Sequence, residues 1–482
     1  MLHTKAISNI LSALLLFLAL SLIAPAIFAY INNEGDFSAF LTTIGFSFSI
    51  GIIVFLLTRN HNEELRAKDG FIIVTLGWLL FSFIGALPFY LSGFIPSYTD
   101  AFFETMSGFS TTGATILTDI EILPHGLLFW RSLTHWLGGM GIILLSLAIL
   151  PLLGVGGMQL FKAEVPGPSP DKLTPRIKHT AELLWGVYLL LTVVEVILLR
   201  FGGMDWFDSV CHSFGTLATG GFSTKNASIG FYNSAYVDYV ITLFMILAGL
   251  NFSLHYRALK GKPLIYFKDP ESLFFFGIII VATLAIFFSV WTQTSADFAL
   301  SFRQAFFQVV SIITTTGYGT ADYEQWSSMS RMILLILMFF GGCAGSTGGG
   351  LKIIRSLILI KFSLNEIKRL IHPQAVLPVR IGKIVVQRDI ITNVAGFYLF
   401  YVTLFVFGVL FMNVLGLDIE TALGGVAATI GNIGPALGDL GPTDNYSFIP
   451  DVGKWFMSFL MLVGRLEIYT VLVIFTPIFW KK

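Results

Sequence analysis

Long apolar stretches separated by short polar connections make up almost the whole of the 482-residue chain. A helix needs about 20 apolar residues to cross a bilayer. Ten stretches approach or exceed that length, and we expect spans at 7–31, 38–58, 70–93, 125–150, 180–202, 234–258, 271–292, 330–362, 388–414 and 455–479. Four shorter amphipathic pieces lie between them, at 98–111, 206–219, 302–316 and 419–432. They are too short to cross and are predicted to be re-entrant half-helices.

The composition agrees with a polytopic membrane protein. Hydrophobic residues make up 55% of the chain and charged residues 12%, whereas soluble domains carry about 25% charged residues. The formal net charge is zero, so no nucleic-acid partner is expected. The two cysteines, Cys211 and Cys343, lie in or near apolar stretches, which excludes a disulfide framework or a cysteine metal site as the default. The first apolar stretch is too long for a signal-peptide core and is predicted to be a retained helix.

Basic residues are concentrated in alternate connections, at 59–69, 151–179, 256–270 and 361–388. By the positive-inside rule these connections are cytoplasmic, as are both termini, and the half-helices enter from the outer face. The opposite connections are acidic. The acids expected at the outer face include Asp100, Glu104, Asp119, Glu121, Asp322, Glu324, Asp418, Glu420, Asp439 and Asp444.

Each half-helix is followed by a loop that contains glycine. The third loop, Thr315-Thr316-Gly317-Tyr318-Gly319, is similar to the carbonyl-lined loop that replaces the water around K⁺ in potassium channels. A single loop cannot surround an ion. Aligning Gly113, Gly220, Gly317 and Gly434 places the four half-helices in register, each with a span before it and a span after it. The chain therefore carries an internal fourfold repeat.

The chemistry of a potassium filter explains these residue types. Backbone carbonyls must face one axis, and glycine both adopts unusual backbone angles and lets loops approach closely. The C-terminal dipole of each half-helix also favours a cation. Small-residue helix packing is the alternative explanation, but it does not account for four copies in register. The predicted filter residues, which would bind potassium as the only ion or cofactor of the chain, are Thr111, Thr112, Gly113, Ala218, Thr219, Gly220, Thr315, Thr316, Gly317, Asn432, Ile433 and Gly434.

The predicted fold class is thus an all-α polytopic membrane protein with four pore repeats around one central pore. An N-terminal transmembrane hairpin precedes the repeats. The expected bounds are 1–62 for the hairpin and 63–160, 161–262, 263–370 and 371–482 for the four repeats.

The span predicted at 330–362 is interrupted by six glycines within residues 341–350. Each glycine costs a helix about 1 kcal/mol relative to alanine, so we expect a break there. Freed backbone groups at this depth need water or protein partners, which favours a loop that obstructs the pore below the filter. A passive break between crowded helices is the alternative. The predicted gating residues are Gly345, Ser346, Thr347, Gly348 and Gly349, with Lys352 and Arg355 anchoring the inner end of the loop.

Arg465 is a charged residue inside the last apolar stretch. A charge at the centre of a membrane costs at least about 2.5 kcal/mol, so it usually faces a cavity or a partner. Glu467 is two residues away on another face of the helix and is a poor partner. Both a cavity-facing role and a structural ion pair remain open from the residues alone.

Several long motifs resemble those of the Trk/Ktr/HKT superfamily of potassium transporters. The resemblance covers essentially the whole chain, and the N-terminal hairpin is similar to the Trk branch. The motifs are STTGAT at 110–115, HWLGGMGIILLSLAILPLLGVGGMQL at 135–160, GGFSTKNASIG at 220–230, GGCAGSTGGGLKIIR at 341–355 and GRLEIYT at 464–470.

The resemblance implies a protein that takes up K⁺ across the bacterial inner membrane. It implies a homodimer in the lipid bilayer, gated by a cytosolic TrkA-like nucleotide-binding ring, and it gives Arg465 the role of a pore-facing charge near the gate. Two loops depart from the Thr-Thr pattern of the family, at Ala218-Thr219 and Asn432-Ile433. This departure predicts a filter that is less symmetric than that of a tetrameric channel.

Two alternatives remain. A K⁺ symporter coupled to H⁺ or Na⁺ would use the same filter. An intramembrane serine protease would use Ser346, but no histidine motif supplies its base, and no enzymatic activity is expected.

Overall fold

The computed structural model describes residues 2–59, 65–148, 173–294 and 297–481, and the structural statements below concern these residues. Six of their helices are long and apolar enough to cross a membrane, or eight if two bent helix pairs each count as one span. The only strands within these ranges are the short β1 (Arg380–Ile381) and β2 (Ile384–Val385), which pair antiparallel. The predicted all-α polytopic fold is confirmed.

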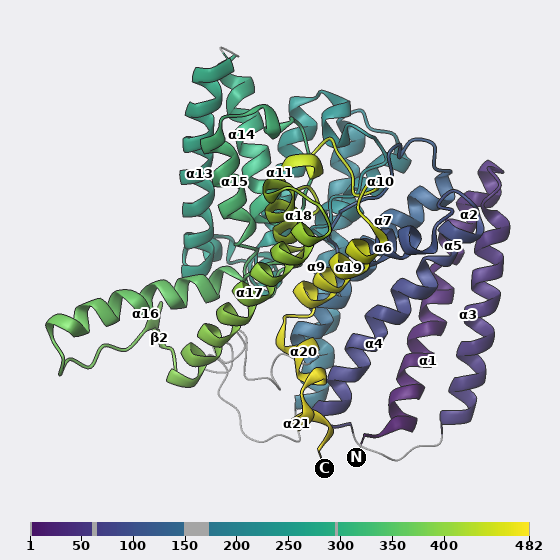
Figure 1. The fold of residues 1–482 in the computed structure, drawn as a ribbon, viewed down its shortest axis with the longest axis horizontal. Helices are drawn as coiled ribbons and strands as arrows, with labels where there is room; N and C mark the ends of the chain where they lie inside the picture. Colours follow the sequence, from purple (N-terminus) through teal and green to yellow (C-terminus); the bar gives the residue numbers. More distant parts are fainter. Residues whose placement is uncertain (1, 60–64, 149–172, 295–296, 482) are drawn as a thin grey trace.

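An N-terminal hairpin lies at one side of the bundle (Figure 1, purple). One apolar span is formed by α1 (Thr4–Ser21) and α2 (Ile23–Asn32), and α3 (Phe37–Thr58) returns beside it. The helices pack closely, because a side chain at Gly51 would meet Leu16 at 2.9 Å. The outward faces stay apolar and exposed, as at Ile53 and Leu57, which suits contact with lipid tails.

The remaining helices follow the order of a span, a short helix and a second span four times. The bounds are α4 (Ala67–Gly85) with α5 (Leu87–Leu91), α6 (Tyr98–Phe109) and α7 (His125–Ala148); α9 (Leu173–Phe201), α10 (Trp206–Leu217) and α11 (Ala235–Gly249) with α12 (Phe252–Leu259); α13 (Pro270–Thr294), α14 (Phe298–Ile313) and α15 (Ser328–Met338) with α16 (Ile353–Ile371); and α17 (Arg388–Val414), α18 (Ile419–Gly431) and α19 (Asp451–Arg465) with α20 (Tyr469–Leu472). Short additional helices are η2 (Ser228–Tyr232), η3 (Pro263–Phe267), η4 (Tyr323–Gln325), η5 (Gly438–Leu440), η6 (Val473–Phe475) and α21 (Pro477–Trp480).

Three of the four short helices begin at a residue whose side chain caps the helix. Ser97 caps α6, Asp205 caps α10, and Asp418 caps α18 by accepting the N–H groups of Glu420 and Thr421. Such caps satisfy donors that have no partner inside the helix. All four short helices are largely buried, so the bundle surrounds them.

Two predicted spans are sharply bent rather than straight. The stretch predicted at 234–258 turns by 105° between α11 and α12, because Asn251 leaves the helix and caps α12 through Ser253. The last stretch turns by 110° after α19, where Glu467 adopts a φ of 56°. A left-handed residue that is not glycine is rare and ends the α-helix.

Both chain ends lie at the same end of the bundle (Figure 1). They are tied to α4, since His3 contacts Asp69 at 2.8 Å and Lys68 donates to the carbonyl of Phe479 at 2.9 Å. The expected domain boundaries near residues 62 and 160 fall outside the described ranges, as does most of the predicted basic connection 151–179.

Candidate functional site

The four short helices end in the same backbone turn. The first loop residue has a positive φ each time: 51° at Thr111, 54° at Thr219, 61° at Thr315 and 55° at Asn432. The next residue donates its N–H to the carbonyl five positions earlier. These bonds run from Thr112 to Ser107, Gly220 to Gly215, Thr316 to Ser311 and Ile433 to Ala428, at 2.8–2.9 Å.

This turn corrects the alignment of the second loop by one residue. The third residue of each loop is a glycine with positive φ: Gly113 (83°), Gly221 (78°), Gly317 (80°) and Gly434 (96°). Gly220 therefore corresponds to Thr112, and Ala218 is the C-cap of α10 rather than a loop residue. The sequence alignment chose the wrong member of the pair Gly220-Gly221. The departure read at Ala218-Thr219 moves by one residue: Thr219 matches Thr111 and Thr315, and Gly220 stands where the first and third loops have a second threonine.

The four positive-φ glycines form a closed ring of contacts. A side chain on Gly113 would overlap the carbonyl oxygen of Gly220. A side chain on Gly221 would likewise overlap the carbonyl oxygen of Thr316, and one on Gly317 would overlap that of Ile433. A Cβ on Gly434 would lie 2.7 Å from the carbonyl oxygen of Thr112. The fourth loop therefore contacts the first, and the ring of contacts closes. Glycine is required at these positions by both the backbone angle and the close approach.

A cavity of about 110 Å³ opens at this ring, and all four of these glycines line it. Asp444 lies in its wall. The pKa of this carboxyl is raised by burial and then by repulsion from Asp322 and Asp439. Several negative charges are therefore crowded at the mouth of the ring, where they favour a cation.

Glu104 is not at the mouth, although the sequence placed it among the outer acids. It is buried on α6 and accepts hydrogen bonds from Arg131 Nε at 2.6 Å, Thr115 Oγ1 at 2.9 Å and Ile116 N at 3.0 Å. Arg131 also donates to the carbonyl of Ser223 at 2.8 Å. A buried carboxylate needs such partners, and this pair joins the first loop to the second.

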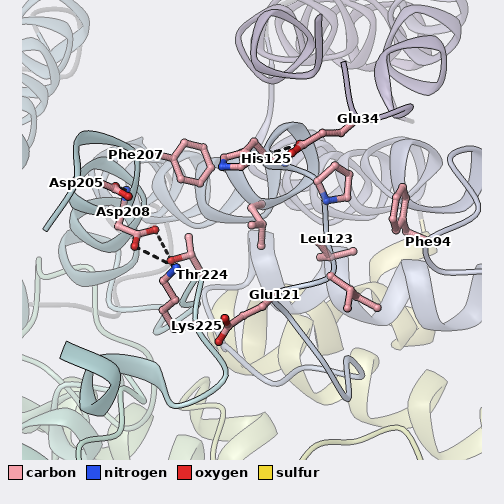
Figure 2. Close-up of a pocket in the computed structure, with 13 residues that line it drawn as sticks. Glu34, Phe94, Glu121, Leu123, His125, Asp205, Phe207, Asp208, Thr224 and Lys225 are labelled. Atoms are coloured by element: carbon pink, nitrogen blue, oxygen red, sulfur yellow. Dashed lines mark hydrogen bonds and ion pairs between the residues drawn. The ribbon is translucent and has the colours of Figure 1, made fainter. Parts of the chain in front are cut away.

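A larger cavity of about 440 Å³ is lined by residues of the N-terminal hairpin, of the start of α7 and α10 and of the second loop, and it shares Lys225 with the first cavity (Figure 2). Its carboxylates already have partners. Asp208 accepts from Thr224 at 2.6 Å and pairs with Lys225 at 3.5 Å, and Glu34 contacts His125 at 2.9 Å. These acids hold the second loop and the N-terminal hairpin in place.

The predicted helix break is present between α15 and α16. Residues 341–352 (the glycine-rich segment) lie against the ends of the short helices. Gly349 N donates to Thr315 Oγ1 at 2.7 Å, and Thr347 Oγ1 donates to the carbonyl of Leu217 at 2.8 Å. A Cβ on Gly349 would also lie 2.6 Å from the carbonyl oxygen of Gly431. The segment thus covers the C-terminal ends of α10, α14 and α18.

Arg465 holds this segment from another side. It is 2% exposed and donates to the carbonyls of Thr347 at 2.7 Å and Gly138 at 3.0 Å. No carboxylate pairs with it among the residues that the structure describes. Glu467 pairs with Arg355 instead, and Lys352 donates to the carbonyl of Gly348. Of the two residues expected to anchor the inner end of the segment, Lys352 bonds within it, whereas the Arg355 side chain bonds to Glu467 outside it.

Ser346 has no catalytic partner in the described ranges. Its Oγ accepts a hydrogen bond from Gly348 N at 3.3 Å. Both ring nitrogens of His255 are engaged, with the Tyr266 hydroxyl and the Leu247 carbonyl. No group of three His, Cys, Asp or Glu side chains is placed to hold a metal ion within these ranges.

Sequence reasoning missed two buried carboxylates near the site. Glu271, in the first turn of α13, bonds to the glycine-rich segment. Glu195 lies on α9 and is 0% exposed. It carries the same signal that marked Arg465, a charge inside an apolar stretch. Glu271 had a weaker signal, because it stands at the start of its span.

The corrected register predicts different outcomes at the two adjacent glycines. A Cβ on Gly220 meets the imidazole of His135, whereas one on Gly221 meets the Thr316 carbonyl. We expect Gly220→Ala and Gly221→Ala each to lower the midpoint of thermal unfolding in detergent. His135→Ala should offset only the Gly220 variant, with a coupling of about 1 kcal/mol. An equal coupling energy between His135→Ala and each of the two glycine variants would contradict the corrected register.

The comparisons with known proteins cover the chain from end to end. The TrkH family model, described as a cation transport protein, matches residues 37–482. The Trk system potassium uptake proteins TrkH of Halomonas elongata and Escherichia coli are each 43% identical, over 99% and 100% of both chains respectively. The crystal structure of the potassium transporter TrkH from Vibrio parahaemolyticus matches with a TM-score of 0.91 and 38% identity over 100% of both chains. The chain therefore belongs to the TrkH family of cation transport proteins.

Proposed function

We propose that this protein takes up K⁺ across the bacterial inner membrane through a filter built from four loops of one chain. The observation that carries the proposal is the closed ring of glycine–carbonyl contacts at Gly113, Gly221, Gly317 and Gly434. The names of the relatives support the ion, since they are potassium uptake proteins. Membership of a transport family also agrees with the expectation that the chain is not an enzyme.

The filter follows from the repeated turn. In each loop a left-handed residue, a middle residue and a left-handed glycine bring the backbone out of the short helix. In this proposal their carbonyls replace the hydration shell of K⁺, and the helix dipoles add negative potential. The corrected filter is Thr111, Thr112, Gly113, Thr219, Gly220, Gly221, Thr315, Thr316, Gly317, Asn432, Ile433 and Gly434.

Uptake of radioactive Rb⁺ into vesicles that contain the purified protein tests the filter. K⁺ should compete strongly and Na⁺ and Li⁺ weakly. Gly113→Ser should weaken this preference, because its side chain would push against the Gly220 carbonyl. Gly277→Ser is the matched control, since a Cβ there meets nothing within 4 Å. Uptake that ignores both the cation and Gly113→Ser would refute the filter.

The glycine-rich segment is proposed to be the gate, through Gly345, Ser346, Thr347, Gly348 and Gly349. Its contacts with the ends of three short helices would obstruct an ion that leaves the filter. Arg465 adds a positive charge beside this path and bonds to the segment. A flexible glycine segment can change conformation at low cost.

Arg465→Gln tests the gate. The amide keeps one donor but loses the charge and the second donor, so the segment should be held less firmly. We expect Rb⁺ uptake without any added partner to rise about tenfold, the effect of about 1.4 kcal/mol. Arg200→Gln is a control, because Arg200 lies at the end of α9 and donates to the nearby Met204 carbonyl. Unchanged uptake in Arg465→Gln would remove the residue from the gate.

The remaining features of the assembly are proposed on the charge pattern and the family. Both termini are cytoplasmic, and the protein is a homodimer whose gate responds to a TrkA-like nucleotide-binding ring. The pore units are those predicted at 63–160, 161–262, 263–370 and 371–482, after the hairpin 1–62. Both termini lie at the same end of the bundle (Figure 1), which supports an even number of crossings.

H⁺-coupled K⁺ symport is a second candidate function, and Glu195 favours it. This carboxyl is fully buried on α9 with the Thr216 side chain as a polar neighbour, and neither oxygen makes a hydrogen bond within 3.5 Å to a described residue. Intramembrane carboxyls of this kind serve proton relays in transporters. The helix α9 packs against α10, so a proton on Glu195 would lie within the second pore unit, beside its short helix.

An imposed proton gradient separates the two functions. Coupled transport predicts that an inward gradient accelerates Rb⁺ uptake and that Glu195→Gln, which mimics the protonated carboxyl, abolishes the acceleration. Glu182→Gln is the control, because it changes an exposed carboxylate on the same helix. This variant should keep the acceleration of Rb⁺ uptake. A wild-type protein that is insensitive to the gradient excludes this coupling.

A further inference from the structure

Glu271 joins two parts of the broken helix through one oxygen atom. It lies in the first turn of α13 and is 7% exposed. Its Oε1 accepts the backbone N–H of Ala344 at 2.7 Å and that of Ile354 at 3.0 Å. Ala344 belongs to the glycine-rich segment, and Ile354 to the first turn of α16. A single carboxylate from another helix therefore holds both.

The bond to Ile354 replaces a cap that α16 lacks. The N-cap residue Lys352 makes no capping hydrogen bond with its side chain. The first N–H groups of any helix have no partner inside it, and a carboxylate at a helix N-terminus is stabilising. Hydrogen bonds to a charged group are also stronger than neutral ones.

We propose that Glu271 is the latch of the gate: its carboxylate holds Ala344 and α16 together and so keeps the glycine-rich segment across the pore. This inference rests on the gate proposed above. Because the same oxygen accepts both N–H groups, α16 cannot separate from α13 without losing the bond to Ile354, and a carboxylate displaced with α16 would lose the bond to Ala344 as well. Glu271 is a positioning residue, since it acts on the ion path through the segment.

The shape of α16 lets a force on it reach the latch. The helix projects sideways from the bundle (Figure 1). Residues 353–358 at its start are buried, whereas Leu364, Ile367 and Leu370 farther along are exposed. A partner that moves the exposed part would pull on the bond to Ile354. Arg355, one residue further, pairs with Glu467, two residues along the chain from Arg465, so the same motion reaches the element that carries the second attachment of the segment.

Cys343 is a built-in reporter for the latch. It precedes Ala344, is 1% exposed and donates its N–H to the Gly249 carbonyl at 2.8 Å. The other cysteine, Cys211, is also buried and is removed by Cys211→Ser. The test measures the rate of Cys343 labelling by a membrane-permeant maleimide and Rb⁺ uptake, both in vesicles with the full chain and no partner.

Glu271→Ala should accelerate labelling about tenfold and raise Rb⁺ uptake by a similar factor. Asp269→Asn is the matched control, because this carboxylate lies two residues away and accepts its bonds from Ser272. It should change neither rate. Faster labelling with unchanged uptake supports the latch but refutes the gate on which it rests. Unchanged labelling in folded Glu271→Ala overturns the latch.

Glu271→Asp keeps the test decisive if the alanine variant does not fold. The carboxylate is retained but withdrawn by one methylene, so it cannot reach both donors in the same position. Labelling and uptake should rise by a smaller factor than in the alanine variant. Wild-type rates for both in Glu271→Asp would also overturn the latch.

Discussion

The contact of four backbone carbonyls with four glycines of neighbouring loops determines how the surrounding helices must be placed. Each loop enters this ring through a left-handed residue, and three of these are threonines. A β-branched residue in this conformation is strained, and such strain costs about 1–3 kcal/mol per residue. The ring can persist only if the surroundings hold every loop from outside.

The support of each loop uses different chemistry, although the four backbones are alike. The first two loops share the buried pair Glu104–Arg131. The third loop is held by the Tyr318 hydroxyl, which donates to the His212 carbonyl at 2.9 Å. In the fourth, the Tyr446 hydroxyl donates to the Gly434 carbonyl at 2.7 Å. A single chain permits this, because each copy of the repeat can acquire its own side chains.

The sequence was sufficient to predict where the helices lie and where one span is broken, because the length of an apolar stretch and its glycine content are local properties of the chain. It failed at the second loop, because Gly220-Gly221 offers two registers with the same composition. Only the backbone angle distinguishes them. It also misplaced Glu104, since an acid in a short helix looks the same whether it faces water or Arg131. The hydrogen bonds of Glu271 join residues that are 73 and 83 positions apart, and no local pattern encodes such pairs.

The glycine-rich segment belongs to one of the four units, and this affects how steeply transport can depend on a regulator. A tetrameric channel opens by moving several identical parts, so cooperativity is inherent in its symmetry. In the proposed gate one segment covers one axis, so the pore of a single chain would be a simple two-state element. Any sigmoidal dependence on a regulator must then arise from coupling between separate binding sites, outside the filter and its cover.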